Sequence, residues 1–511
     1  MAEGGDGAEL GTVVATWDGP TTANFSFVLN SNSVRKGQFV KVETEDGLLI
    51  GSVSDITRAN RYFERAESVA EYEKNGSRLM ESFPTTDWEY TVANCRALGL
   101  YNKENLLVRN VFPPAPGSKV LPVEEARLKS LLGFEENGLA LGKLAAHDVE
   151  ARIGLNRLLQ KHFAILGMSG CGKSYLTGVV IEELLDRKRE HGRPAVIVVD
   201  VHGEYVGFAD RNGGYGDRAT VFDGRKIRIG MSGVSPRVLA EFVPDASPVA
   251  KRELARIMER LHREKREARE LYGLDDLVNR VDSDATLKDN VKGPLLGMLY
   301  ALKGLRLFGK ATFPASKDLA RPGRLAVIDL SGIDDARRKQ VIVAYFGRRL
   351  FKQRKKERIP PFLLMVEESH NFAREKARGS EFFAKPVIEL IAREGRKFGA
   401  SLCLISQRPV QLSTTALSQA NTHIIMRVTN PYDIKHIGES CEGIDQGMLG
   451  SITTLRTGEA MIVGEAANFP AFVNVRKRRG ARSARGGSME SIAKKFEDAM
   501  ESKKKDVEAF L

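Results

Sequence analysis

The sequence predicts an α/β protein with a parallel sheet, a small β-barrel before it and a helical insertion within it. Residues 9–117 read as short β-branched and aromatic segments between Gly, Asn and Asp turns, a pattern typical of a small barrel. From about residue 150, unbroken apolar runs such as "FAILG" and "PAVIVVD" alternate with helical patterns, as in parallel strands buried on both faces. Charged helical sequence over 235–310 interrupts this alternation.

The expected domain organisation follows these changes of pattern, and a chain of 511 residues is too long for one ordinary core. "VFPPAPGSKV" is a Pro/Gly break after the barrel segments, and "EYEKNGSRLMES" predicts a helix or loop inserted in the barrel. In order, we expect a flexible tail (1–8), the β-barrel (9–117), a linker (118–150), the first part of the α/β core (151–234), the helical insertion (235–310), the second part of the core (311–478), and a basic linker with a C-terminal helix (479–511).

Composition narrows the class of protein and of partner. The net charge of +12 is compatible with a polyanion such as nucleic acid, although a generically basic protein would show it too. The four cysteines form no CxxC pair, so neither a zinc site nor a disulfide framework is expected. No apolar run approaches the roughly 20 residues that cross a bilayer, and the first residues lack a signal-peptide pattern. We therefore expect a cytoplasmic protein without a membrane partner.

The clearest motif is a phosphate-binding loop between a buried strand and a helix. "GMSGCGKS" matches G-x-x-x-x-G-K-[ST], in which glycines let backbone N–H groups face phosphate oxygens. The lysine reaches the β- and γ-phosphates, the serine hydroxyl binds Mg²⁺, and the helix N-terminus favours the anion. The expected ligands are ATP and Mg²⁺, and the expected nucleotide-binding residues are Gly167, Met168, Ser169, Gly170, Cys171, Gly172, Lys173, Ser174 and Tyr175.

Two adjacent carboxylates follow another buried strand, in "PFLLMVEESH". We expect Glu367 on the metal side and Glu368 as the base that positions the attacking water. The first acid is usually Asp, and the longer arm of Glu367 would hold the metal through water. Asp329, after "LAVI", is a competing candidate whose simpler role is to cap the end of its strand.

Two more strand ends carry polar groups, and in open parallel sheets ligand groups gather at carboxyl ends of strands. Asp200, His202 and Glu204 follow one buried run, and Gln407 follows another. A glutamine there senses the γ-phosphate or orients water. Simple turn roles explain His202 and Gln407 equally well.

Four motifs after the phosphate loop, in the order "DVHGEY", "VEESHNF", "AREGRKFGASLCLISQRP" and "MRVTNPYDIKHI", resemble the HerA family of archaeal DNA translocases within the wider HerA/FtsK group. The resemblance runs from about residue 9 to 478. It implies a RecA-like P-loop ATPase core, a homo-hexameric ring with ATP between subunits, and double-stranded DNA in a central basic channel. It also implies docking on a NurA-type nuclease for DNA end resection in recombination repair.

The resemblance assigns roles to individual residues. The phosphate and Mg²⁺ contacts fall to Lys173 and Ser174, the acid pair to Glu367 and Glu368, the sensor to Gln407, and an arginine acting on the next subunit's nucleotide to Arg396 first and Arg393 second. Without the resemblance, both arginines read as ordinary helix-surface cations. Some relatives carry another arginine where this chain has Lys161, and a lysine lacks the bidentate fork.

The sequence allows more than one assignment of the DNA contacts and more than one function. Interleaved Glu and Arg over 251–269 favour a solvated helix, whereas the basic run 476–479 is either a DNA contact or a tail. Nuclease docking predicts an exposed apolar patch on the barrel, but "FSFVL" is equally well barrel core. The alternatives are a secretion or conjugation ATPase, a nucleotide-binding scaffold ring without turnover, and a small-molecule kinase.

Overall fold

The computed structural model describes residues 8–15, 19–60, 63–74, 88–376, 382–481 and 489–510. Most of the expected N-terminal tail, the last eight residues of "EYEKNGSRLMES" and part of the expected basic linker lie outside these residues. The chain forms two units, Met1–Gly154 with Gly443–Arg476, and Leu155–Glu442 with Lys477–Leu511. The boundaries expected from sequence differ from this division and stay predictions of domain organisation.

The first unit contains a closed antiparallel barrel, because β2 pairs with both β1 and β5. Its strands, in barrel order, are β2 (Asn24–Leu29), β1 (Gly11–Val14), β7 (Lys119–Pro122), β3 (Phe39–Thr44), β4 (Gly47–Asn60) and β5 (Glu89–Tyr101). Side chains alternate with the two-residue period of a strand, so Phe25 and Phe27 are buried. "FSFVL" is therefore barrel core. The short β6 (Leu107–Val108) pairs with β5, and α1 spans Ala66–Glu73.

The rest of this unit is a second antiparallel arrangement in the order β19-β20-β8-β9. Its elements are α3 (Glu125–Leu132), β8 (Leu139–Leu144), β9 (Glu150–Ile153), α15 (Gln446–Thr454), β19 (Glu459–Gly464) and β20 (Ala471–Val475). Segments from both ends of the chain therefore build one unit.

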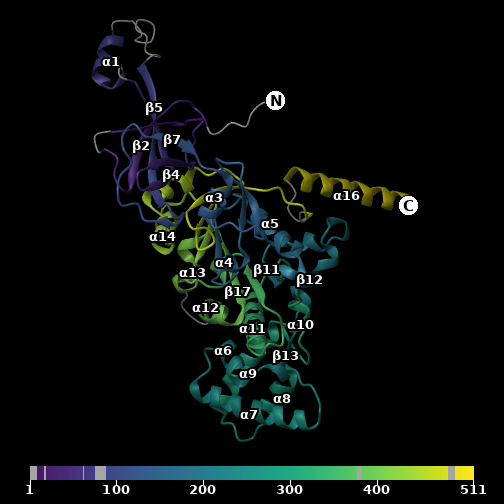
Figure 1. Ribbon diagram of the computed structural model, residues 1–511. Helices are drawn as coiled ribbons and strands as arrows, with labels where there is room; N and C mark the ends of the chain where they lie inside the picture. The colour runs from purple at the N-terminus through teal and green to yellow at the C-terminus, as the bar shows by residue number, and fades with distance from the viewer. Residues whose placement is uncertain are drawn as a thin grey trace. The chain divides into compact units, whose positions relative to one another are not determined.

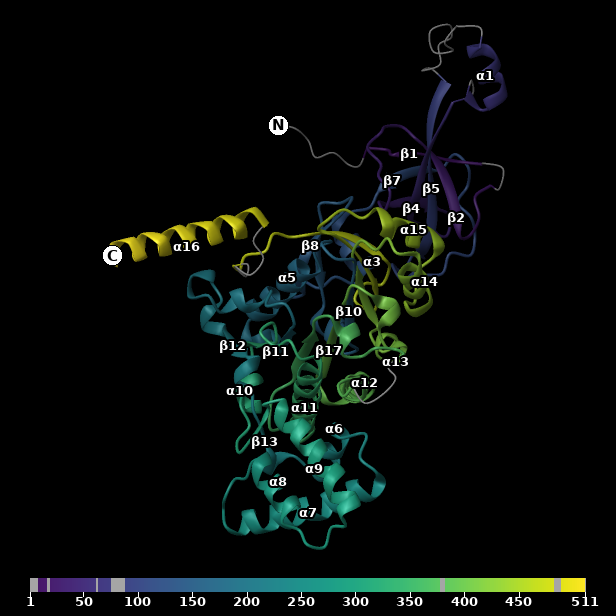
Figure 2. The ribbon, with the colours of Figure 1, turned by 180° about the vertical axis from the view of Figure 1, so that it is seen from behind.

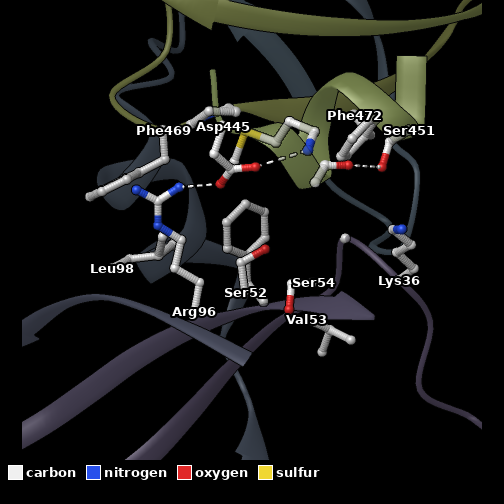
Figure 3. A pocket seen from close by; sticks show the side chains of 15 residues that line it. Lys36, Ser52, Val53, Ser54, Arg96, Leu98, Asp445, Ser451, Phe469 and Phe472 are labelled. Carbon is white, nitrogen blue, oxygen red and sulfur yellow. Dashed lines mark hydrogen bonds and ion pairs between the residues drawn. The ribbon is translucent and has the colours of Figure 1, made fainter. Parts of the chain in front are cut away.

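A cavity of about 70 Å³ lies where barrel strands meet this returning segment (Figure 3). Arg96 of β5 pairs with Asp445 at 2.5 Å, and Asp445 also caps α15 by accepting the N–H of Met448 at 2.9 Å. Phe472 of β20 packs on Gly37, where a Cβ would lie 3.2 Å from the ring. The ion pair and the ring hold the segment 443–476 to the barrel.

The second unit is built on a parallel sheet in the order β12-β15-β11-β16-β17-β10-β18. The strands are β10 (Phe163–Leu166), β11 (Ala195–Asp200), β12 (Ala219–Asp223), β15 (Leu325–Asp329), β16 (Phe362–Val366), β17 (Ala400–Ser406) and β18 (Thr422–Ile425). Every residue of β10, β11, β15, β16 and β17 is buried, as expected for strands covered on both faces. The predicted fold class, a RecA-like parallel-sheet core with a small N-terminal barrel, is confirmed.

Helices connect these strands and cover the sheet (Figure 1). They are α4 (Leu155–Leu159), α5 (Lys173–Asp186), α10 (Ser316–Leu319), α11 (Ala336–Lys355), α12 (Lys385–Glu394), α13 (Thr414–Ser418) and α14 (Pro431–Ser440). A further helix, α16, spans Met489–Phe510. None of the helices among the described residues is long and apolar enough to cross a membrane.

Four helices gather at one end of this unit, beside the small β13–β14 pair, in both views (Figures 1 and 2). They are α6 (Pro236–Phe242), α7 (Pro248–Glu267), α8 (Leu274–Asp282) and α9 (Asp289–Gly304), and the strands are β13 (Ile229–Gly230) and β14 (Phe308–Gly309). Helix α7 buries a stripe that includes Leu254, Met258 and Leu261. Its charges pair on the surface, for example Arg256 with Glu253, which fits the solvated helix expected from its charge pattern.

Candidate nucleotide-binding and catalytic site

The phosphate loop connects β10 to the first turn of α5. Gly170 and Gly172 adopt φ angles of +76° and +108°, a region that glycine enters without a steric penalty. A Cβ on Gly167 would lie 2.7 Å from the Cys171 sulfur, so the loop turns tightly on itself. The Lys173 ammonium donates a hydrogen bond to the Met168 carbonyl at 2.9 Å, so the lysine of the loop contacts the backbone of the same loop. Phosphate oxygens compete for the same ammonium and backbone N–H groups.

The chain after β18 forms one wall of this loop. The Met168 N–H donates to the Arg427 carbonyl at 2.9 Å, and a Cβ on Gly167 would lie 3.0 Å from that of Met426. Burial raises the pKa of the Cys171 thiol, and the nearby positive charge of Arg427 acts to lower it. Arg427 thus adds a cation beside the loop that the sequence analysis did not single out. Its position in "MRVTNPYDIKHI" is the only sequence signal for it.

Glu368 has an unusual backbone conformation directly after β16. Its φ of +47° is uncommon for a residue with a side chain, and such conformations cluster at functional sites. The carboxylate is buried, and one oxygen accepts from the Gln407 amide at 3.0 Å. The other oxygen, Oε2, has no hydrogen-bond partner among the described residues. A buried carboxylate oxygen without a partner suits an acceptor for a water proton.

Two histidines flank this carboxylate. His202 Nε2 lies 3.7 Å from Glu368 Oε1, and His370 Nδ1 lies 3.3 Å from Glu368 Oε2. Burial lowers the pKa of His370 to about 4, and the charges of Arg408, Lys173 and Arg374 add to this effect. His370 is therefore neutral near pH 7, and Lys173 belongs to the same electrostatic environment as the acid.

The other acid, Glu367, points to the end of β11 rather than to Gln407. Its Oε2 accepts the N–H groups of Val201 and His202 at 2.9 and 3.3 Å. Burial raises the pKa of Glu367, and the neighbouring Glu204 and Asp200 carboxylates raise it further. Asp200 itself caps the next turn by accepting three backbone N–H groups, from Gly203 to Tyr205. Crowded carboxylates of this kind fit a divalent cation or a shared proton.

Arg393 and Arg396 lie at the opposite edge of the sheet from the phosphate loop. Both come just before β17, whereas the loop follows the carboxyl end of β10, which is parallel to β17. The seven residues of β17, at about 3.3 Å each, separate the two edges by about 20 Å. Neither arginine therefore reaches the nucleotide site of its own chain. Arg393 lies 3.9 Å from Glu389, while the guanidinium of Arg396 has no hydrogen bond or ion pair among the described residues.

A buried histidine supports the turn that carries these arginines. His162, at φ +61°, accepts the Leu402 N–H at Nδ1 and faces the Ala392 carbonyl with Nε2, both at 3.0 Å. Only the neutral ring with its proton on Nε2 satisfies both contacts. His162 thereby ties the end of α12 to β17 across the turn that holds Arg396. The sequence analysis did not identify this residue.

The basic run 476–479 is used within the protein. Arg478 lies 4.4 Å above the Phe208 ring, and its N–H donates to the Tyr175 hydroxyl at 2.6 Å. Arg479 pairs with Glu183 and Asp186 of α5 at 3.0 and 2.9 Å. These contacts favour a structural role on the phosphate-loop helix over a DNA contact.

Of the remaining predicted residues, Gln407 lies beside Glu368, and Ser174 lies in the first turn of α5. Asp329 accepts from the Ser331 N–H at 3.0 Å, in agreement with a strand-end cap. The structure therefore brings Glu368 and Gln407 together with two histidines, and it leaves Arg393 and Arg396 apart.

Comparisons with known proteins agree with this architecture. Residues 139–350 match the family model described as "Helicase HerA, central domain". The DNA double-strand break repair helicase HerA of Pyrococcus furiosus is 30% identical over 525 residues, covering 91% of this chain and 92% of that protein. The Sulfurisphaera tokodaii protein of the same name is 26% identical, covering 90% and 92%. The structure of VirB4 of Thermoanaerobacter pseudethanolicus matches with a TM-score of 0.52 and 14% identity, covering 67% of this chain and 97% of that one, which is a likeness of fold.

Proposed function

The chain belongs to the HerA family of P-loop helicases, and we propose that it is an ATP-driven, hexameric translocase on double-stranded DNA. We further propose that it acts with a NurA-type nuclease in DNA end resection. The observation that carries the proposal is the division of catalytic groups between two opposite edges of one sheet. The phosphate loop and Glu368 lie at one edge, and the unpaired Arg396 lies at the other.

This division supports hydrolysis at an interface between copies. An arginine about 20 Å from its own nucleotide acts only on the nucleotide of a neighbour. In a ring, the arginine of each subunit completes the nucleotide site of its neighbour. Turnover at one subunit then depends on the position of the next. Closed rings are the usual outcome of such head-to-tail contacts.

Within one site, the residues have distinct roles. Lys173 and the loop N–H groups bind the β- and γ-phosphates, Ser174 and Glu367 hold Mg²⁺, and Glu368 accepts the proton of the attacking water. Mg²⁺ would neutralise charge on the phosphates and relieve the crowding of Glu367, Glu204 and Asp200. Gln407 holds Glu368 through one oxygen and so leaves Oε2 for the water. This network argues against a scaffold ring without turnover.

The first expected result concerns DNA. ATP hydrolysis by the purified protein should rise on addition of linear double-stranded DNA, because a motor on DNA couples turnover to its track. The stimulation should fall steeply as salt increases, since contacts to phosphates release counterions. A coupled-enzyme assay at several salt concentrations measures both effects. Hydrolysis indifferent to DNA at low salt, with the nuclease present as well as absent, would contradict the proposal.

A nuclease partner needs a docking surface, and the barrel unit exposes an apolar one. Leu106, Val111 and Phe112 are 57, 72 and 69% exposed, next to the half-exposed β6. The buried Asn110 donates to the Thr22 carbonyl at 2.9 Å and holds this segment in place. A fixed apolar patch of this kind is typical of a protein interaction site.

The expected result is that Val111→Ser with Phe112→Ser weakens binding of the cognate NurA-type nuclease at least tenfold. Basal ATP hydrolysis should stay unchanged, because the barrel is a separate unit from the catalytic sheet. Tyr300→Ser, which removes another exposed aromatic ring, from α9, is the matched control. Binding measured by interferometry that is equal for all three proteins would remove the patch from the proposal.

A further inference from the structure

A pocket of about 460 Å³ opens at the amino-terminal edge of the sheet. It lies where β16 and β17 begin and where the chain enters β11, with Phe362, Ala400 and Pro194 on its wall. Its volume is within the range of sites for small molecules. The phosphate loop is at the other edge, so this pocket is distinct from the chain's own nucleotide site.

The charged lining of this pocket is cationic. Arg193 and Arg396 both line it, and neither guanidinium forms an ion pair or hydrogen bond with any described residue. The stem of Arg193 packs on Gly323, where a Cβ would lie 2.9 Å from the arginine Cδ. No carboxylate is among the described lining residues. Two guanidinium groups without a counter-charge favour an anionic ligand.

A buried hydroxyl in the same wall is also without a partner. Ser401 is 6% exposed and lines the pocket, and its Oγ makes no hydrogen bond within the described part of the chain. Buried polar atoms are rarely left unsatisfied, so this one points to a group that arrives from outside the chain. A hydroxyl and two guanidinium groups that line one pocket match the oxygens of a phosphate chain.

We propose that this pocket is the second half of the nucleotide site, and that Arg193 and the Ser401 hydroxyl, together with Arg396, bind the phosphates of ATP held by the phosphate loop of a neighbouring copy. The assignment rests on the proposed function and adds two residues to it. It also supplies a second arginine for the interface, from the segment that leads into β11.

The test compares Arg193→Gln with Arg189→Gln, which removes an exposed arginine four residues away and outside the pocket. Arg193→Gln should lower kcat about tenfold to hundredfold in assembled protein, whereas Arg189→Gln should behave as wild type. Arg193→Lys keeps the positive charge but loses the two parallel N–H donors of the guanidinium, so its kcat should lie between those of the other two variants. Ser401→Ala should raise the KM for ATP about threefold to tenfold, because it removes one neutral contact.

Subunit mixing shows whether the pocket acts on a neighbour. Arg193→Gln keeps its own phosphate loop and Glu368, while Glu368→Gln keeps the pocket. Turnover should therefore rise above the level of either variant alone when the two impaired proteins are co-assembled. If Arg193→Gln matches its control while Arg396→Ala is inactive, the pocket assignment is wrong and the proposed function stands. If wild type shows neither assembly nor turnover, the proposed function itself fails.

A second binding measurement separates a neighbour's nucleotide from a free anion. Lys173→Ala protein, with its own loop disabled, is titrated with inorganic triphosphate under conditions in which it is monomeric. The expected result is no binding, because the pocket holds only half of the contacts. Binding that Arg193→Gln abolishes in that background would overturn the assignment and indicate an independent anion site.

Discussion

Glu368→Gln should lower kcat for ATP by about 10²–10⁴-fold while the protein still binds the nucleotide and assembles. The substitution keeps the size of the side chain and the hydrogen bond to Gln407, but it removes the charge that accepts a proton from water. The oxygen Oε2 of this residue is buried and has no hydrogen bond among the described residues. The loss should therefore fall on kcat and leave ATP-analogue affinity within about threefold.

The control for this prediction is Glu439→Gln, which removes an exposed carboxylate from α14. Its kcat should equal that of wild type. Stopped-flow turnover and equilibrium binding measure the two quantities separately. A Glu368→Gln protein that hydrolyses ATP at the control's rate would show that another group activates the water, and the histidines at positions 202 and 370 would then be the nearest candidates.

The backbone at Glu368 explains why this acid, and not Glu367, faces the water site. A continuous strand sends successive side chains to opposite faces. The left-handed conformation at residue 368 breaks that pattern, so that Glu367 turns to the N–H groups after β11 and Glu368 turns to Gln407. Such a conformation costs of order 1–3 kcal/mol, which the hydrogen bonds around both acids offset.

Much of the catalytic sheet was predictable because each strand carries its own signal. The apolar runs before Gly167, Glu367 and Gln407 are long enough to be fully buried strands, and their polar ends meet because parallel strands end at one edge. The pairing of Glu368 with Gln407 follows from β16 lying next to β17. The sequence contains no local signal for that adjacency.

Other features could not be predicted because they depend on contacts between distant segments. The pocket with Arg193 and Ser401 is formed where separate strands begin, and the sequence analysis considered mainly strand ends. Residues 443–476 belong to the unit that contains the barrel. The sequence of β19 does not predict this, because its apolar pattern resembles that of any buried strand. The contact of Arg479 with Asp186 also joins positions far apart in the chain. A basic run alone does not show whether it faces acids or solvent.

Arg396→Ala should be inactive on its own, with a loss of about 10³-fold or more in kcat, because an arginine supplied by a neighbour stabilises charge that develops on the γ-phosphate. The expected loss is large for a residue whose guanidinium makes no hydrogen bond or ion pair among the described residues and which lies at the edge opposite the phosphate loop. A structural surface cation in that situation would contribute at most a few tenths of a kcal/mol. The size of the effect therefore separates the two roles.

Complementation decides whether the action is on a neighbour. Arg396→Ala retains Lys173 and Glu368, and Glu368→Gln retains Arg396, so a mixed assembly contains interfaces with every group in place. ATP turnover should reappear on mixing, whereas a mixture of Lys173→Ala with Glu368→Gln should stay inactive, because both defects then lie on the same side of each interface. Arg393→Ala serves as the matched arginine control, since Arg393 already has Glu389 as a neighbour at 3.9 Å and should lose much less activity. If Arg393→Ala is the inactive and complementing variant, the acting arginine is Arg393. If neither variant is complemented, hydrolysis does not depend on an arginine from the next subunit.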